Sequence, residues 1–191
     1  MRCLLCSNFS LPHICRTCQS QFLRPNLTQR AVGTDLIVYS FYKYHDIAKL
    51  LKTKHTYIGS AIYTILAQNS MQLFAREFQY KKPLYALGID DHAKDGYAHT
   101  AILARALNSP SIKARYGKIR AQRDISYSGK NLAYRLSHPR GFSYHDSGLG
   151  EVILVDDIIT TGTTLLEAKE VLEKAGESVL FSLTLADARD F

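Results

Sequence analysis

Apolar runs and polar breaks alternate along the chain, and the spacing of the apolar positions changes between that of a strand and that of a helix. Residues 83–89, 112–116 and 179–185 are short runs with the apolar content of strands. Residues 35–44 are rich in β-branched and aromatic side chains and predict one strand, or a strand that runs into a turn. Residues 152–155 are apolar throughout, as expected for a strand buried on both faces of a parallel sheet.

Helical spacing fills the intervals between these runs. Apolar residues recur every three or four positions over 58–79, 98–108 and 165–175, and Gly176 ends the last of these segments. Because the predicted strands alternate with helices, the expected fold class is α/β, with a mostly parallel sheet and helices on both of its faces.

Length and composition favour one full domain with a small appendage. The 191 residues can bury a sizeable core, and a hydrophobic fraction of 46% is typical of a globular protein. A break at 24–26 divides an N-terminal knuckle, residues 1–24, from an α/β domain, residues 25–191. No apolar run reaches the ~18 residues that span a bilayer, and cysteines stand where a signal peptide would have an apolar core. We therefore expect a cytoplasmic protein without a membrane span.

The knuckle contains all the cysteines of the chain. Cys3, Cys6, Cys15 and Cys18 form two C-x2-C pairs separated by eight residues. Two such turns can place four thiolates around one ion, and structural Zn²⁺ is the usual ion for four thiolates in an intracellular protein. Iron, a redox pair and free thiols are the alternatives, and His13 is an alternative ligand. The bound metal would supply the folding energy of this short segment.

The positive charge of the chain is concentrated in one segment. Residues 113–140 hold eight basic residues and one acidic residue, and this excess of seven equals the net charge of +7. Such a segment favours nucleic acid, pyrophosphate or an acidic membrane face, although a solvated basic surface has the same composition. Tyrosines within it can stack bases. The candidate nucleic-acid-binding residues are Lys118, Arg120, Arg123, Lys130, Arg135 and Arg140.

Two carboxylates and a hydroxyl-rich loop follow the strand at 152–155. Asp156 and Asp157 come directly after the apolar run, where the strands of a parallel sheet gather their ligands. A loop of small residues that leads into a helix offers backbone N–H groups to an anion such as phosphate. Carboxylates repel a phosphate, so this pair should face sugar hydroxyls or a metal. A threonine-rich helix cap is the alternative interpretation. The loop residues are Thr160, Thr161, Gly162, Thr163 and Thr164.

This segment resembles the phosphoribosyl pyrophosphate (PRPP) motif of the type I phosphoribosyltransferases. The resemblance implies that Asp156 and Asp157 bind the two ribose hydroxyls and serve as the catalytic pair. It also implies that residues 160–164 hold the ribose 5-phosphate and that Mg²⁺ accompanies PRPP. His92, Lys94 and His99 either supply positive charge on the pyrophosphate side or are solvated loop residues.

The order of knuckle, α/β domain and PRPP motif resembles the ComF family, which is associated with natural transformation and uptake of single-stranded DNA. Residues 95–107 are similar to a helix of that family, and residues 118–142 are similar to its arginine-rich stretch, which ends here in Arg140, Gly141 and Phe142. The chain departs from the family at Asp95, where an arginine is usual.

Three functions are consistent with these observations. The resemblance implies a competence factor that binds incoming single-stranded DNA and PRPP or a related phosphorylated ribose, with a competence helicase or a membrane-channel component as a partner. A salvage phosphoribosyltransferase, which transfers ribose 5-phosphate from PRPP to a nucleobase, is the alternative. The third hypothesis is a structural adaptor, in which the knuckle recruits a helicase or channel partner and the phosphate site is vestigial.

Overall fold

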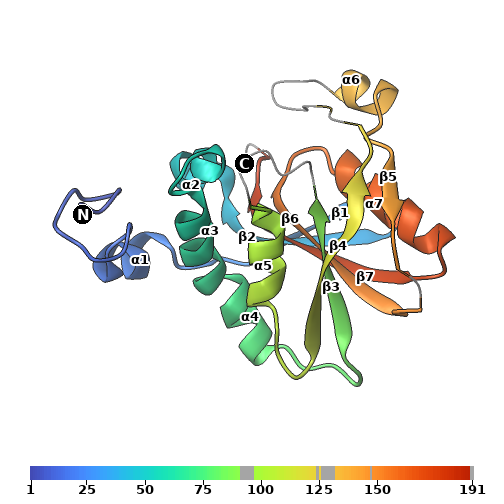
Figure 1. Ribbon diagram of the computed structural model, residues 1–191, viewed down its shortest axis with the longest axis horizontal. Helices are drawn as coiled ribbons and strands as arrows, with labels where there is room; N and C mark the ends of the chain where they lie inside the picture. Colours follow the sequence, from blue (N-terminus) through green and yellow to red (C-terminus); the bar gives the residue numbers. More distant parts are fainter. Residues whose placement is uncertain (91–96, 124, 126–131, 147, 190–191) are drawn as a thin grey trace.

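The computed structural model describes residues 1–90, 97–123, 125, 132–146 and 148–189. These residues form a seven-stranded sheet with the strand order β1-β2-β7-β6-β3-β4-β5 (Figure 1). The inner pairs are parallel, and β1 and β5 join the edges as antiparallel strands. The strands are β1 Thr28–Val32, β2 Leu36–Lys43, β3 Leu84–Asp90, β4 Ile112–Ala121, β5 Phe142–Tyr144, β6 Glu151–Ile159 and β7 Ser178–Asp187.

Helices cover both faces of the sheet. Ile153 and Val155 of β6 belong to the buried cluster formed with the helices between β2 and β4, whereas Val152 and Leu154 belong to the cluster formed with α7. This division follows from the two-residue period of a strand. None of the helices in the described ranges is long and apolar enough to cross a membrane. The helices are α1 Arg16–Phe22, α2 Tyr44–Leu51, the 3-10 helix η1 Lys52–His55, α3 Gly59–Gln68, α4 Met71–Glu77, α5 His99–Ala106, α6 Leu132–Ser137 and α7 Thr163–Lys174.

The α/β architecture is the one predicted from the sequence. The predicted strands at 35–44, 83–89, 152–155 and 179–185 correspond to β2, β3, β6 and β7. The strand predicted at 112–116 is longer, because β4 continues to Ala121, where it pairs with β5. The elements that were not predicted are α1, α2, η1, α6, β1 and β5.

The predicted helix over 58–79 is two helices, because the chain turns between α3 and α4. Ser70 leaves the helical region with φ −134° and ψ −83°. The Ser70 hydroxyl donates to the carbonyl of Leu66 at 2.7 Å, and the Asn69 side-chain amide donates to the carbonyl of Ile65 at 2.8 Å. These side chains satisfy carbonyls at the end of α3. The turn lets Met71 of α4 point into the core.

The knuckle packs against the same core as the sheet. Ile14 and Leu23 are fully buried in the cluster that includes α3 and α4. The hydroxyl of Tyr42 in β2 donates to the carbonyl of Leu23 at 3.1 Å, and the amide of Asn69 donates to the side chain of Gln19 at 3.0 Å. The boundary between residues 1–24 and residues 25–191 stays a prediction.

Candidate functional site

The turn between β6 and α7 forms an open cradle for an anion. Gly162 is the N-cap residue of α7 and has φ +83°, a left-handed conformation that favours glycine. A Cβ atom at this position would lie 2.3 Å from Cγ1 of Val32 in β1, so the turn packs too closely on β1 for any other residue. The first amides of an α-helix have no intrahelical acceptor, and the helix dipole makes this end positive.

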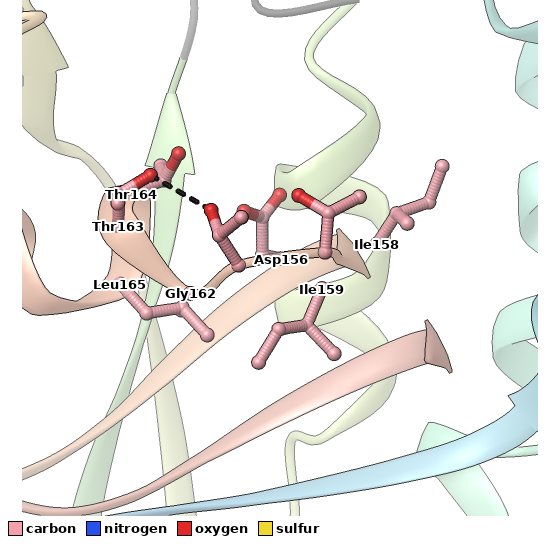
Figure 2. Close-up of a pocket in the computed structure, with 9 residues that line it drawn as sticks. Asp156, Ile158, Ile159, Gly162, Thr163, Thr164 and Leu165 are labelled. Carbon is pink, nitrogen blue, oxygen red and sulfur yellow. Dashed lines mark hydrogen bonds between the residues drawn. The ribbon is translucent and has the colours of Figure 1, made fainter. Parts of the chain in front are cut away.

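A pocket at this turn brings the predicted phosphate loop together with one of the two carboxylates. Figure 2 shows Asp156, Thr163 and Thr164 around the same opening, whose space of about 190 Å³ includes open solvent. The hydroxyls of Thr161 and Thr163 are 3.2 Å apart. The lining residues are Asp156, Ile158, Ile159, Thr160, Thr161, Gly162, Thr163, Thr164 and Leu165.

Asp157 points away from this pocket, toward the helices on the other face of the sheet. Its Oδ2 atom accepts hydrogen bonds from Lys54 Nζ at 3.1 Å and from the hydroxyl of Tyr63 at 3.0 Å. His99 Nε2 lies 3.5 Å from the same oxygen. Because Asp156 and Asp157 are consecutive in β6, their Cβ atoms leave the strand on opposite sides, although one oxygen of each carboxylate lies within 4.8 Å of the other. The two carboxylates therefore have different surroundings, although the sequence assigned them one role.

The surroundings shift the pKa values of the two carboxylates in opposite directions. Burial and the adjacent charge of Asp157 raise the pKa of Asp156 to about 7. Burial also acts to raise the pKa of Asp157, but His99, Lys54 and the hydrogen bond from Tyr63 outweigh it and hold that pKa below the ordinary range. Burial lowers the pKa of His99, although the charge of Asp157 acts to raise it. Asp157 is thus the ionised member of the pair.

Two of these three partners, Lys54 and Tyr63, were not identified as site residues from the sequence. Lys54 comes from η1, Tyr63 from α3 and His99 from the first position of α5. Only His99 was a candidate, as one of several groups near the pyrophosphate side. His92 and Lys94, the other two, lie outside the described residues.

Arg140 lies beside the pocket and not on an open basic surface. Its guanidinium interacts electrostatically with Asp156 and Glu167, and burial lowers its pKa. The backbone N–H groups of Arg140 and Gly141 donate to the Glu167 carboxylate at 3.2 and 2.6 Å. Glu167 belongs to α7, so these bonds hold the start of β5 against the helix that follows the phosphate loop.

The other candidate nucleic-acid residues differ in exposure. Arg120 and Arg123 are exposed, and Arg123 donates to the carbonyl of Pro139 at 3.3 Å. Lys118 forms an ion pair with Asp146, with the charged atoms 3.1 Å apart. Lys130 lies outside the described residues. The backbone of Arg135 is part of α6, but its side chain is also outside the described part of the chain.

Arg30 connects the edge strand β1 to the predicted phosphate loop. Its guanidinium donates to the carbonyl of Thr160 and lies 3.5 Å from the carboxylate of Asp187 at the end of β7. Arg189 binds the same carboxylate at 2.7 Å. No pattern in the sequence indicated this contact, because β1 itself was not predicted.

The four cysteines form a cluster that fits a tetrahedral metal ion. Their sulfur atoms all lie within 4.8 Å of one another, and those of Cys6 and Cys15 are 3.8 Å apart. Four sulfurs at ~2.3 Å from a tetrahedral Zn²⁺ would be about 3.8 Å apart. Burial acts to raise the pKa of Cys3, but backbone hydrogen bonds, the largest from Cys15, lower it to about 6. Burial raises the pKa of Cys18, so a metal would have to displace that proton.

A comparison with protein-family models identifies the family of the α/β domain. The model described as the phosphoribosyl transferase domain matches residues 60–190, which include β6, the phosphate loop and α7. The chain belongs to the phosphoribosyl transferase domain family. The predicted type I phosphoribosyltransferase fold is therefore confirmed. A search of curated protein sequences gives no match.

Solved structures of phosphoribosyltransferases resemble this member of the family at low identity. A hypoxanthine phosphoribosyltransferase from Staphylococcus aureus is 17% identical, with a TM-score of 0.40, over 65% of this chain and 62% of that chain. An adenine phosphoribosyltransferase from Leishmania tarentolae is 13% identical, with a TM-score of 0.46, over 84% of this chain and 94% of that one. An orotate phosphoribosyltransferase from Aeropyrum pernix is 19% identical, with a TM-score of 0.36, over 90% and 80% of the two chains.

Proposed function

We propose that this phosphoribosyl transferase domain binds PRPP or a related phosphorylated ribose and acts on incoming single-stranded DNA as a ComF-like competence factor in the cytoplasm. The observation that carries the proposal is the cradle at the start of α7, where Gly162 and the threonine hydroxyls face the same opening as Asp156. A phosphate and a sugar fit such a site because amides bind the one and a carboxylate binds the hydroxyls of the other.

Different residues of the cradle bind the phosphate and the ribose of the ligand. The 5-phosphate lies against the N-terminus of α7, where the amides and hydroxyls of residues 161–164 donate to its oxygens. Asp156 accepts hydrogen bonds from the ribose hydroxyls, and Arg140 limits the repulsion between this carboxylate and the phosphate. Asp157 acts by holding Lys54, Tyr63 and His99 and does not contact the sugar. Mg²⁺ would accompany the pyrophosphate of PRPP, whose oxygens are the ligands that this ion prefers.

Single-stranded DNA is the second ligand in this proposal. Exposed cations follow β4 and the residues after it, including Lys113, Arg115, Arg120 and Arg123. Tyr116 is 48% exposed among them and offers a ring on which a base can stack. The hydrogen bonds between Glu167 and the start of β5, which pairs with β4, keep this basic edge attached to the phosphate site.

The knuckle is the surface that we assign to a protein partner. Phe9 and Leu11 are 84% and 93% exposed, and Phe22 is 60% exposed on the neighbouring α1. Such side chains fit a competence helicase or a membrane-channel component that covers them.

Reversing the charge of the exposed residues Arg120 and Arg123 is expected to weaken the binding of single-stranded DNA. The double variant Arg120→Glu and Arg123→Glu should bind a single-stranded oligonucleotide at least ~10-fold more weakly, because phosphate neutralisation supplies most of this affinity. Fluorescence anisotropy at several salt concentrations is the measurement. The slope of log Kd against log salt should also decrease in magnitude.

The matched control reverses the charge of two exposed arginines that lie on helices and not on β4 or directly after it. Arg76 of α4 and Arg105 of α5 are exposed, so the double variant Arg76→Glu and Arg105→Glu carries an identical net charge. It should bind DNA within about threefold of the wild type. Equal losses in both double variants would show that net charge, and not this edge, holds the DNA.

Transfer of ribose 5-phosphate to a nucleobase is a second candidate function, favoured by the family match over residues 60–190. If it is correct, the protein should release pyrophosphate from PRPP and Mg²⁺ in the presence of some purine or pyrimidine. Asp156→Asn should then lower the rate by at least ~100-fold, because the carboxylate fixes the sugar during transfer. A coupled pyrophosphate assay across a panel of bases is the measurement, and no release with any base excludes this function.

A further inference from the structure

Three side chains at the carboxylate pair form an arrangement that resembles a site for a divalent cation. One imidazole nitrogen of His99 and one carboxylate oxygen each of Asp156 and Asp157 all lie within 4.8 Å of one another. Carboxylate oxygens with an imidazole nitrogen are a ligand set that Mn²⁺ and related ions accept. On these three residues alone, the site could hold a metal ion.

The residues around this group do not fit a resident metal ion. Lys54 Nζ lies 3.1 Å from Oδ2 of Asp157, and the hydroxyl of Tyr63 donates to the same oxygen at 3.0 Å. The side chain of Asp157 is only 8% exposed, so water does not screen it strongly from the ammonium. A divalent cation that bound there would have to approach this ammonium or displace it.

We propose that Lys54 is the built-in cation of this cluster: its ammonium takes the place that a divalent metal ion would take and keeps the carboxylate pair free of bound metal. Asp157 and Lys54 then neutralise each other. Asp156 remains for the ligand, with the charge of Arg140 nearby. A consequence, which rests on the proposed function, is that ribose 5-phosphate binds at this site without any metal.

The fold holds Lys54 in place and does not leave it as a mobile surface lysine. The hydroxyl of Tyr97 donates to the backbone carbonyl of Lys54, and the hydroxyl of Thr53 donates to the carbonyl of Leu50 at 2.6 Å. Gly59 lets α3 approach this turn, since a Cβ there would lie 2.2 Å from the hydroxyl of Tyr97. The backbone of η1 is therefore fixed by groups on both sides, and the Lys54 side chain is 26% exposed.

The proposal is tested by the binding of Mn²⁺ alone to the full zinc-loaded chain, measured from the electron paramagnetic resonance signal of free Mn²⁺. Lys54→Met removes the charge and keeps the length of the side chain. It should bind one Mn²⁺ at least ~10-fold more tightly than the wild type does. Lys54→Arg keeps the charge and should resemble the wild type. Adding His99→Ala to Lys54→Met should remove the gain, because it removes one of the three ligands.

Asp157 loses its charged partner in Lys54→Met, which can lower the stability of this variant, so a second neutral variant provides an independent test. Lys54→Gln can still donate a hydrogen bond to Asp157 and should also gain Mn²⁺ affinity, with a circular dichroism spectrum like that of the wild type. Equal Mn²⁺ affinity in the wild type and both neutral variants would overturn the proposal, and so would a gain that His99→Ala leaves unchanged. This assay contains no sugar phosphate, so its result is independent of the proposed function. Calorimetry of ribose 5-phosphate in the presence of EDTA tests the consequence separately.

Discussion

Replacing Gly162 with alanine is expected to remove measurable binding of phosphorylated ribose, with Kd raised by at least ~100-fold. Alanine at φ +83° is strained, and its Cβ would lie 2.3 Å from Cγ1 of Val32, a distance that the packed strand cannot accept. The turn must therefore move away from β1, and the amides at the start of α7 move with it. Isothermal titration calorimetry with PRPP measures the loss.

Two further variants separate the clash from the conformational strain. Gly176 has φ +87° at the end of α7 and nothing within 4 Å of an added Cβ, so Gly176→Ala carries the strain without the collision. It should destabilise the fold by about 1 kcal/mol and bind PRPP as the wild type does. Adding Val32→Ala to Gly162→Ala should restore part of the affinity, because it removes the colliding methyl groups. Wild-type affinity in Gly162→Ala alone would contradict the assignment of the phosphate to this turn.

Because the four cysteines fit a tetrahedral Zn²⁺ ion, removing one buried cysteine of the knuckle is expected to abolish zinc binding and to loosen the N-terminal segment. Cys18→Ser should lower the zinc content from one ion per chain to none, because it removes one of the four ligands. The segment should loosen because a structural Zn²⁺ site supplies about 10–16 kcal/mol of folding energy. Because Ile14 and Leu23 pack in the core shared with the sheet, loss of zinc should also lower the stability of the α/β domain. A cost of ~3 kcal/mol would lower Tm by about 6–12 °C in a chain of this size.

Zinc analysis and thermal melting measure the two effects, and His13→Ala is the control. His13 is the only histidine in the knuckle, and its removal should leave the zinc content and the melting temperature unchanged if the four cysteines are the ligands. Retention of one zinc ion by Cys18→Ser would contradict the four-cysteine site. If the wild type contains iron and not zinc, the assignment of the four cysteines as ligands stands, and the metal ion of the site is iron.

The turn between β6 and α7 could be predicted from the sequence because its parts are contiguous, and its role in phosphate binding stays a prediction. Residues 156–164 cover the end of β6, the turn and the start of α7, so local propensity and spacing describe them completely. The partners of Asp157 could not be predicted in this way. Lys54 and Tyr63 are separated from it by 103 and 94 residues, and only the packing of η1 and α3 against β6 brings them together.

The sequence also does not determine the direction in which a side chain points. Arg140 belongs to the basic segment by composition, but the bonds between Glu167 and residues 140–141 turn it toward Asp156. Four of the five residues of the edge strand β1 are exposed or half-buried and only Val32 is buried, a pattern that edge strands tolerate and that gives little apolar signal. Its contribution to the site, through Arg30 and Val32, was therefore not visible.

A crystal structure of the protein soaked with ribose 5-phosphate tests the assignment of this ligand to the turn before α7 most directly. We expect the phosphate within hydrogen-bond distance of the amides of residues 161–164, and the ribose hydroxyls on Asp156 with Asp157 still bound to Lys54. A ligand bound elsewhere while this turn is empty, or ribose hydroxyls on Asp157 in place of Lys54, would contradict it.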